Sequence, residues 1–457
     1  MKMKNTYKLF AQSILSLLSL LTFTSCDKML DIDSKDNVDS EHIFKSVKNF
    51  EYAVLGTYAD LHLEYSALIG SILADECKLS PENNGVDGYG VNLHRWTYSS
   101  DDEILSEIWS NYYNHIYRIN NLLINAHKVP VERASDQAAL NSMLAELHGL
   151  RALIHFELHR IFGPGDYQSK QALTIPYITT TDVFYKPGKI TLQTFYDNLW
   201  SDIDQTDQLT HSTNNRLSES AIAALSARIA LYERDYLKAI HYSSWIIEHQ
   251  ALANVKNYAN IWTDSNEDEV LFKLKRNAQD KVRPNTLWYN YATGKTLFYS
   301  SEKIRESYDQ NDVRNTCFLG QENNKYIVKY GGNQSNNRIN DYKVFRTSEA
   351  YLIRAEAYLA TGQSDKALSD VNTILTNRYL SKKQIESINQ KVIEQQRLLE
   401  FAYEGHRYFD LKRLGKDIQR NQNDLVSPMD SNLLSNSDEH YLLPIPQKEI
   451  QANPNLK

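Results

Sequence analysis

Glycine and proline are scarce in this chain, with 16 and 10 of 457 residues. Because both residues interrupt helices, their scarcity favours a helical protein and excludes a collagen-like or linker-rich chain. Only 3 cysteines are present and no two of them form a CxxC pair, so the sequence contains no disulfide framework. The 50 lysine and arginine residues are fewer than the 57 aspartate and glutamate residues. The net charge of −7 argues against the basic surface that a nucleic-acid-binding protein needs, and we expect no nucleic acid among the partners.

Sequence motifs of enzymes and cofactor sites are missing too. The chain has no GxSxG, P-loop, GxGxxG or HExxH pattern. Asp264–Asp268 begins like a calcium loop, but Glu269 and Lys275 stand where an EF-hand needs glycine and glutamate. Adjacent carboxylates such as Asp75 and Glu76 are more typical of helix capping than of acid–base catalysis. We therefore expect a protein that is not an enzyme, with no catalytic residue, metal or cofactor. A calcium ion in the acidic loop stays open as an alternative.

The amino terminus has the pattern of a secretion signal. Three lysines within the first eight residues precede an uncharged apolar stretch, Phe10–Phe23, which is too short for a comfortable membrane span. A small residue, Ser25, then stands directly before Cys26, which resembles the lipobox of bacterial lipoproteins. We predict a signal peptide over residues 1–25, lipidation of Cys26 and a polar, lipidated tether over 26–42. An ordinary secretion signal that is cut elsewhere is the alternative.

Helical spacing of apolar residues begins at Ile43 and recurs through the rest of the chain. It predicts a mainly α-helical fold with helices over residues 52–76, 102–128, 135–162, 191–209, 218–233, 236–250, 347–361, 364–377 and 381–403. Long irregular segments lie between them, above all 78–101 and 254–346, and the second contains short apolar stretches such as Tyr326–Tyr330. Loops of this length in a compact protein are usually functional or disordered, and their aromatic residues favour function. Cys77 and Cys317 can form one disulfide bridge, but nothing in the sequence requires it.

Two of the predicted helix pairs repeat the same spacing of small residues. Ala227 and Ala239 are twelve residues apart, and so are Ala355 and Ala367. This spacing is typical of a tetratricopeptide (TPR) hairpin, in which alanines let two helices approach closely. The repeats are not in tandem, so a simple solenoid is excluded. Two ordinary antiparallel helices with alanine contacts remain the alternative.

Aromatic residues in the irregular segments are the candidates for ligand binding. Tyrosine is unusually frequent, with 30 residues. Sugar rings present apolar C–H faces that stack on phenol and indole rings, while their hydroxyl groups bind polar side chains. Packing against the scaffold is the alternative for any one ring, but we expect at least two of them to contact a ligand. The candidates are Tyr89 and Trp96 in the first segment, and Trp288, Tyr289, Tyr291 and Tyr299 in the second.

Eight segments along the whole chain form a recognisable set. They are Cys26–Asp31, Phe50–Tyr58, Trp109–Leu122, Glu146–Gly163, Asp268–Leu274, Arg346–Thr361, Gln396–Gly415 and Tyr441–Leu456. Together they resemble the SusD/RagB family of outer-membrane nutrient-uptake lipoproteins. Two departures are the missing proline soon after Cys26 and the missing Gly-Tyr at the end of the chain.

The resemblance implies a single SusD-like domain over residues 43–457, with a TPR-like helix-pair scaffold and a large irregular loop region that contains short strands. The helices would occupy about 43–76, 102–162, 191–250 and 347–415, and the ligand side about 78–101 and 254–346. It further implies a lipid-anchored protein on the surface of the outer membrane. Such a protein binds oligosaccharides, or peptides in some members, and acts as the lid of a SusC-like TonB-dependent transporter. A glycan-degrading surface enzyme and a purely structural TPR adaptor are the rival hypotheses.

The most specific matching segment contains many charges. In Glu404–Leu411, and on the preceding turns at Arg397 and Glu400, acidic and basic residues share one helical face. Such spacing could serve acid–base chemistry. The resemblance favours a structural role instead, in which these charges join helices to one another, and it makes His406 an interhelix or surface residue rather than a ligand-binding one.

Overall fold

The computed structural model describes residues 40–83, 85, 88–165, 169–320, 325–332, 339–427 and 430–457. The predicted signal peptide, Cys26 and the first residues of the predicted tether lie outside these ranges. Within them, no helix is both long enough and apolar enough to cross a membrane.

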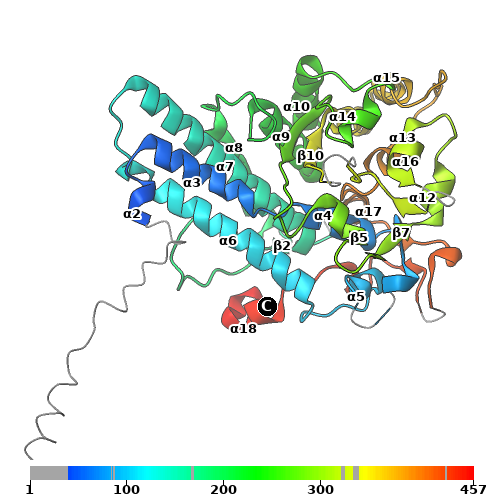
Figure 1. Ribbon diagram of the computed structural model, residues 1–457, viewed down its shortest axis with the longest axis horizontal. Helices are drawn as coiled ribbons and strands as arrows, with labels where there is room; N and C mark the ends of the chain where they lie inside the picture. Colours follow the sequence, from blue (N-terminus) through cyan, green and yellow to red (C-terminus); the bar gives the residue numbers. More distant parts are fainter. Residues whose placement is uncertain are drawn as a thin grey trace, which may run out of the picture.

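Helices make up most of the fold, which confirms the predicted mainly α class. Figure 1 shows α3, α6 and α7 as long helices at one end of the molecule, whereas most of the strands lie toward the other end. The helices that form the scaffold are α2 (Ser40–Ile43), α3 (Val47–Ala59), α4 (Glu64–Ile72), α6 (Glu103–Asn125), α7 (Ala134–Phe162), α8 (Leu192–Ile203), α9 (Glu219–Glu233), α10 (Tyr236–His249), α14 (Thr347–Ala360), α15 (Ser364–Thr376), α16 (Gln390–Phe401) and α17 (Arg407–Arg413).

The start and the buried face of α6 show why these segments are helical. The carboxylate of Asp102 accepts hydrogen bonds from the backbone N–H groups of Ile104 and Leu105, which would otherwise have no partner at the helix start. Further along, Ile108 and Tyr112 recur four residues apart and are buried. The acidic residue at this helix start is therefore a cap. Asp75 and Glu76 are not caps: they directly precede β1, and Asp75 pairs with Arg407 and Lys303.

The helices pack in pairs, with α6 against α7, α9 against α10 and α14 against α15. The four alanines of the TPR spacing are all fully buried in the last two pairs, which confirms their predicted role in close helix packing. Both hairpins turn through a residue in the left-handed region, Arg234 with φ of 64° and Gly362 with φ of 76°. The first hairpin therefore makes the same turn as the second without a glycine.

Two predicted helix boundaries were wrong. The segment predicted as one helix over 52–76 is divided between α3 and α4, because the chain turns after Ala59. The helix predicted over 381–403 begins only at Gln390, where the side chain of Asn389 caps it. The optional disulfide bridge is absent: Cys77 and Cys317 are free thiols.

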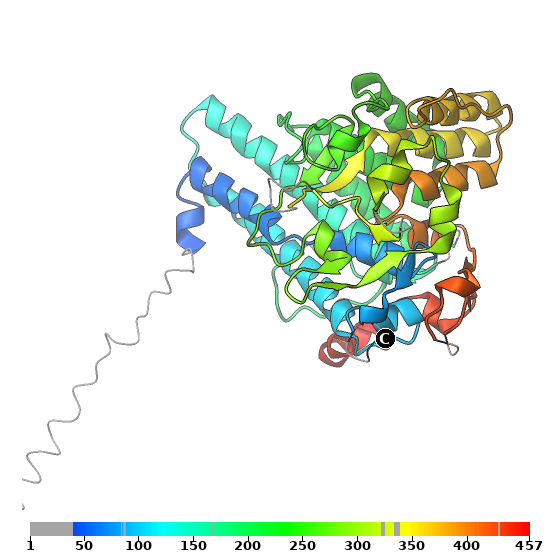
Figure 2. The same ribbon diagram turned by 45° about the vertical axis from the view of Figure 1, so that its right-hand side comes forward.

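The strands are short and antiparallel. Among the described residues, one sheet has four strands in the order β1-β7-β9-β8, and four further sheets have two strands each, β10-β4 among them. The strands are β1 (Cys77–Leu79), β2 (Leu173–Thr174), β3 (Ile190–Thr191), β4 (Val270–Leu274), β5 (Tyr289–Asn290), β6 (Lys295–Thr296), β7 (Phe298–Ser300), β8 (Leu319–Gly320), β9 (Tyr326–Ile327), β10 (Tyr342–Arg346), β11 (Ile418–Gln419) and β12 (Leu433–Leu434). Because β1 pairs with β7, the two irregular segments predicted from the sequence lie together (Figure 2).

Short helices complete the irregular part of the chain. α5 (Val91–Arg95) lies in the first irregular segment, and α11 (Tyr258–Ile261), α12 (Glu302–Ser307) and α13 (Val313–Phe318) lie in the second. At the end of the chain, α18 (Gln447–Ala452) lies beside the start of α6, where Gln447 N donates to the carbonyl of Ser100 at 2.8 Å.

Candidate ligand-binding site

A cavity of about 520 Å³ opens in the irregular part of the protein, between the β5–β6 hairpin and the segment around β9. Its volume is in the range of pockets that hold small molecules. Aromatic rings dominate its wall, and glycines form part of the rest. The described residues that line it are Asn285, Trp288, Tyr289, Tyr291, Thr296, Phe298, Gly320, Tyr326, Ile327, Val328, Tyr330, Gly331 and Gly332.

Two strand pairs place the accessible rings. Tyr289 stands opposite Thr296 in the β5–β6 hairpin, and its ring meets that of Tyr291 edge-on, with 4.8 Å between the centroids. On the other side, Tyr326 of β9 stands opposite Tyr299 of β7, with 5.4 Å between their ring centroids. Tyr291 is 39% exposed and Tyr289 and Tyr326 are half-buried, so ring surface remains accessible to a ligand.

Two buried polar atoms in the wall have no hydrogen-bond partner among the described residues. They are Nε1 of Trp288, which is 3% exposed, and the hydroxyl of Tyr330, which is 1% exposed. Burial raises the pKa of Tyr330 well above its ordinary value, so this hydroxyl keeps its proton. A buried donor without a partner costs about 1–3 kcal/mol, and a ligand oxygen could remove that cost.

None of the described residues that line the cavity carries a charged side chain. The polar groups are amide, hydroxyl and indole N–H. This wall can stack on an apolar face and donate or accept hydrogen bonds. The described lining residues offer no counter-ion to a charged ligand, although Lys325 lies 5.2 Å from the ring centroid of Tyr326, and this lining favours a neutral ligand.

Three of the six aromatic residues predicted from the sequence line this cavity: Trp288, Tyr289 and Tyr291. Tyr299 does not line it, but its ring supports that of Tyr326, which does. Trp288 contributes its buried edge, because its ring also packs against Tyr403 at 5.7 Å.

The structure places Trp96 in the hydrophobic core and not in the cavity. Trp96 is 5% exposed, its Nε1 donates to the carbonyl of Leu73 at 2.9 Å, and the guanidinium of Arg420 covers its ring at 3.9 Å. Tyr89 is half-buried at the edge of the same core, and its backbone N–H donates to Oδ1 of Asn83. The first irregular segment therefore packs against the scaffold, and we leave both residues out of the proposed site.

Tyr326 and Tyr330 were missed as site residues. The sequence indicated only that Tyr326–Tyr330 is a short apolar stretch. A tyrosine at each end of that stretch was the available signal. Which face of the molecule it meets depends on the pairing of β9 with β7, and that pairing joins residues that are distant in the sequence.

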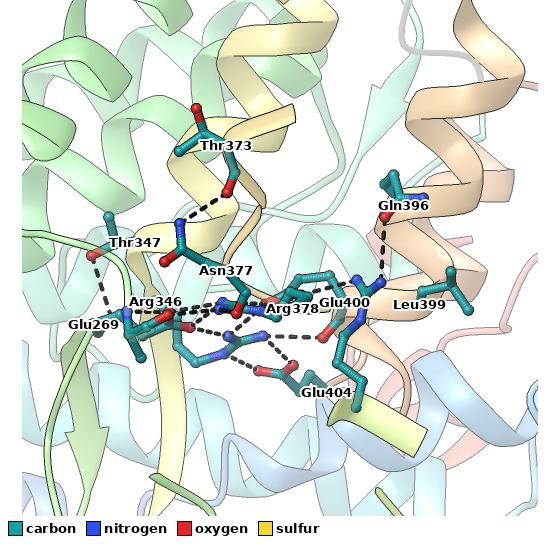
Figure 3. A network of polar contacts seen from close by, with 12 residues as sticks. Glu269, Arg346, Thr347, Thr373, Asn377, Arg378, Gln396, Leu399, Glu400 and Glu404 are labelled. Atoms are coloured by element: carbon teal, nitrogen blue, oxygen red, sulfur yellow. Dashed lines mark hydrogen bonds and ion pairs between the residues drawn. The ribbon is translucent and has the colours of Figure 1, made fainter. Parts of the chain in front are cut away.

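A buried ionic network holds the wall of the cavity to the helices (Figure 3). Glu400 of α16 lies at its centre and accepts hydrogen bonds from three guanidinium groups: Arg346 at 3.0 Å, Arg378 at 3.0 Å and Arg314 at 3.2 Å. Burial alone would raise the pKa of Glu400. The three arginines outweigh it and hold the pKa well below its usual range, so the carboxylate stays charged.

Lys329 connects this network to the cavity. It is fully buried, and its Nζ donates to the carboxylate of Glu404 at 2.6 Å and to the carbonyl of Ala402 at 2.8 Å. Its neighbours Val328 and Tyr330 line the cavity. Burial, which outweighs the attraction of Glu404, lowers the pKa of Lys329 to about 8. The network thus fixes the position of one wall of the cavity.

The charged segment after α16 has the structural role predicted for it. Arg397 forms a two-point ion pair with Asp410 at 2.7 and 3.0 Å and so joins α16 to α17. His406 is 7% exposed and stacks on Phe401 at 4.4 Å, which makes it an interhelix residue. Among the described residues, no group of three or more His, Cys, Asp or Glu side chains is arranged to hold a metal ion. Asp264 of the acidic loop pairs with Lys343 instead.

The burial of Glu76 predicts that the stability of the protein depends on pH. It is 1% exposed, one carboxylate oxygen accepts from the N–H of Tyr403 at 3.3 Å, and burial raises its pKa to about 8. The folded state therefore binds this proton more tightly than the unfolded state does. Glu76 stabilises the fold fully below pH 4.5, and this contribution is lost as the pH rises to about 8.

We expect the Glu76→Gln variant not to lose stability in this way as the pH rises. Relative to the parent protein, the variant should gain roughly 3–4 kcal/mol in free energy of unfolding between pH 5 and pH 8. Urea unfolding followed by circular dichroism at several pH values measures the difference. A constant difference between the two proteins across this range would show that Glu76 is charged in the folded state.

The sequence and the fold of this chain match those of known proteins. A model of the SusD family matches residues 185–457, and a second model, described as "Starch-binding associating with outer membrane", matches residues 26–231. Two relatives come from Formosa agariphila. SusD-like protein P2 is 23% identical and the match covers 96% of each chain, and SusD-like protein P38 is 22% identical over 90% of this chain and 93% of its own.

Solved structures share the fold along almost the whole chain. A SusD superfamily protein from Bacteroides thetaiotaomicron has a TM-score of 0.81 at 23% identity, over 90% of this chain and 99% of its own. Surface glycan-binding protein A from Bacteroides fluxus has a TM-score of 0.71 at 19% identity, over 89% of this chain and 97% of its own. With a family model that matches more than half of its length, this chain belongs to the SusD family.

Proposed function

We propose that this protein binds a neutral oligosaccharide in the aromatic cavity. The observation that carries the proposal is a wall that combines accessible tyrosine rings with two buried, unpartnered polar atoms and, among its described residues, no charge. Rings stack on the apolar faces of sugars, and Trp288 Nε1 and the Tyr330 hydroxyl suit their hydroxyl groups. Relatives with this fold are described as glycan-binding, and a matching family model as starch-binding, which supports the same ligand class.

A peptide is the alternative ligand, as predicted from the family resemblance. Isothermal titration of the protein against neutral oligosaccharides, acidic oligosaccharides and a peptide pool separates the classes. We expect heat of binding from the neutral oligosaccharides alone. Shortened products after incubation with these sugars would favour the rival hypothesis of a glycan-degrading enzyme.

Replacing Tyr289 with alanine should weaken binding of the neutral oligosaccharide by about 1–3 kcal/mol, because the variant loses a stacking surface in the cavity. Titration calorimetry measures the change. Tyr117→Ala is the matched control, because Tyr117 is 45% exposed on α6 and does not line the cavity. Equal affinities of the two variants would place the ligand elsewhere.

We also propose that the protein is anchored by lipid on the cell surface and delivers its ligand to a SusC-like TonB-dependent transporter as the lid of that transporter. The lipobox at Cys26 and the family support this proposal. Co-purification of a β-barrel transporter from detergent-solubilised outer membranes tests the partnership. A protein that binds its sugar but is recovered without such a partner would contradict the lid role alone.

Cys26→Ala should release the protein from the membrane, because the thiol that would take the acyl chains is missing. We expect the parent protein in the membrane fraction and the variant in the soluble fraction, as measured by fractionation and immunoblotting. Incorporation of labelled fatty acid should be lost together with anchoring. A variant that stays in the membrane fraction would exclude this lipidation site.

A further inference from the structure

A second cavity, of about 440 Å³, lies on the helical scaffold away from the β5–β6 hairpin. The end of α8, the first turns of α9 and the middle of α10 enclose it, and Figure 1 shows these helices apart from β5 and β7. Its chemistry differs from that of the aromatic cavity. Three carboxylates line it, those of Asp204, Asp207 and Glu219.

These carboxylates are not neutralised within the described chain. None of the three forms an ion pair with a described residue, and all three residues are exposed. α8 ends at Ile203, so the negative end of its dipole adds to the same potential, whereas the positive end of α9 at Glu219 offsets part of it. Burial and the nearby Asp204 and Asp207 raise the pKa of Tyr242, which also lines the cavity. The three carboxylates therefore give the site a net negative charge, and His241 is the only basic side chain among its described lining residues.

Several residues that line this cavity carry groups that suit an organic cation. The rings of Tyr242 and Trp245 line it, and aromatic faces attract ammonium and guanidinium groups. Ser226 also lines it, is fully buried, and its hydroxyl has no partner among the described residues. A cation that carries N–H donors could supply that partner.

A neighbouring lysine contacts both an aromatic ring and a carboxylate within the chain. The Nζ of Lys238 on α10 lies 4.3 Å from the ring centroid of Trp200 and 3.4 Å from a carboxylate oxygen of Asp235. The described residues contain no group of carboxylates arranged to share a metal ion. An organic cation therefore fits the second cavity better than a metal does.

We propose that the cavity between α8, α9 and α10 binds a protonated amine or guanidinium, held by Asp204, Asp207 and Glu219 against the rings of Tyr242 and Trp245. The cation is either a free small molecule or a basic side chain of a partner protein. This site is separate from the oligosaccharide site and does not depend on it.

Titration of the mature protein with two cationic probes tests the proposal. The probes are agmatine and the blocked tripeptide acetyl-Gly-Lys-Gly-amide, and acetyl-Gly-Gln-Gly-amide is the neutral control. Calorimetry reports binding. We expect both cations to bind, more weakly as salt increases, and the neutral peptide not to bind. Binding of the peptide alone would assign the site to a protein partner, and binding of agmatine alone would assign it to a small molecule.

The double variant Asp207→Asn, Glu219→Gln should weaken binding of the cations about threefold to tenfold, because it removes two of the three charges. Both side chains are exposed, so the fold should be unchanged. Asp365→Asn, at an exposed carboxylate on α15, is the control. Ser226→Ala should weaken the cations and leave oligosaccharide binding intact. Failure of both cations to bind, or equal affinities of the double variant and the control, would overturn the proposal.

Discussion

Replacing Gly405 with alanine should lower the free energy of unfolding by about 3–5 kcal/mol. Gly405 lies in the charged segment between α16 and α17 and has a φ of 82°, a region that side chains rarely adopt. A Cβ there would lie 2.3 Å from the carbonyl oxygen of Ser66 and 2.7 Å from the Cα of Ala67, both in the backbone of α4. Backbone atoms cannot move aside as a flexible side chain can, so α4 and this segment would have to separate.

A second glycine completes the close approach. A Cβ on Gly70 of α4 would lie 2.5 Å from the Cα of Gly405. The carbonyl of Gly405 also accepts a hydrogen bond at 2.8 Å from the guanidinium of Arg160, which is 2% exposed. Because Arg160 belongs to α7, a shift of Gly405 away from α4 would also disturb this buried hydrogen bond.

Gly362→Ala is the matched control for this prediction. Gly362 also has a positive φ, of 76°, but a Cβ there would meet nothing within 4 Å. Its cost should be about 1 kcal/mol, from backbone strain alone. Urea unfolding followed by circular dichroism measures both variants. A Gly405→Ala variant no less stable than Gly362→Ala would show that α4 does not contact this segment closely.

Replacing Glu400 with leucine should also destabilise the protein by about 3–5 kcal/mol. The variant leaves Arg346, Arg378 and Arg314 buried with one carboxylate fewer to pair with. The other acidic partners, Glu269, Glu404 and Asp312, cannot balance them and Lys329 together, so the buried network would carry net positive charge.

The same helix provides a control for Glu400. Glu394 of α16 pairs with Lys416, whose side chain is 41% exposed, so Glu394→Leu should cost at most about 1 kcal/mol. The Glu400→Leu variant should in addition bind the oligosaccharide more weakly, since Lys329 and the adjacent cavity wall lose their fixed position. Similar stabilities of the two variants in chemical unfolding would contradict the central role of Glu400.

Helices and their pairing were largely predictable, because their signals are local. The alanine spacing in 223–243 and 351–371 predicted two hairpins, and all four alanines are buried between their helices. The start of α16 was not predictable from periodicity, since residues 381–389 continue the helical pattern without forming a helix. There the cap at Asn389 decides where the helix begins.

The site was only partly predictable from the sequence. Trp288, Tyr289 and Tyr291 were found because they lie close together in one short hairpin segment. Trp96 looked equivalent in the sequence. It is buried because Arg420 and the carbonyl of Leu73, both far from it along the chain, cover its ring and bind its N–H. Burial of an aromatic ring depends on such distant partners, which composition and spacing do not reveal.

The sequence alone determined that this protein is a mainly helical chain with aromatic irregular segments, because scarce glycine and proline, apolar periodicity and alanine spacing act between near neighbours. Only the tertiary structure decided which aromatic rings form a cavity, and that carboxylates after α8 and on α9 line a second cavity together with rings on α10. It also decided that Glu400 accepts hydrogen bonds from three arginines in separate parts of the chain. Those arrangements depend on strand pairing and helix packing between residues that are distant in the sequence, and only folding brings them together.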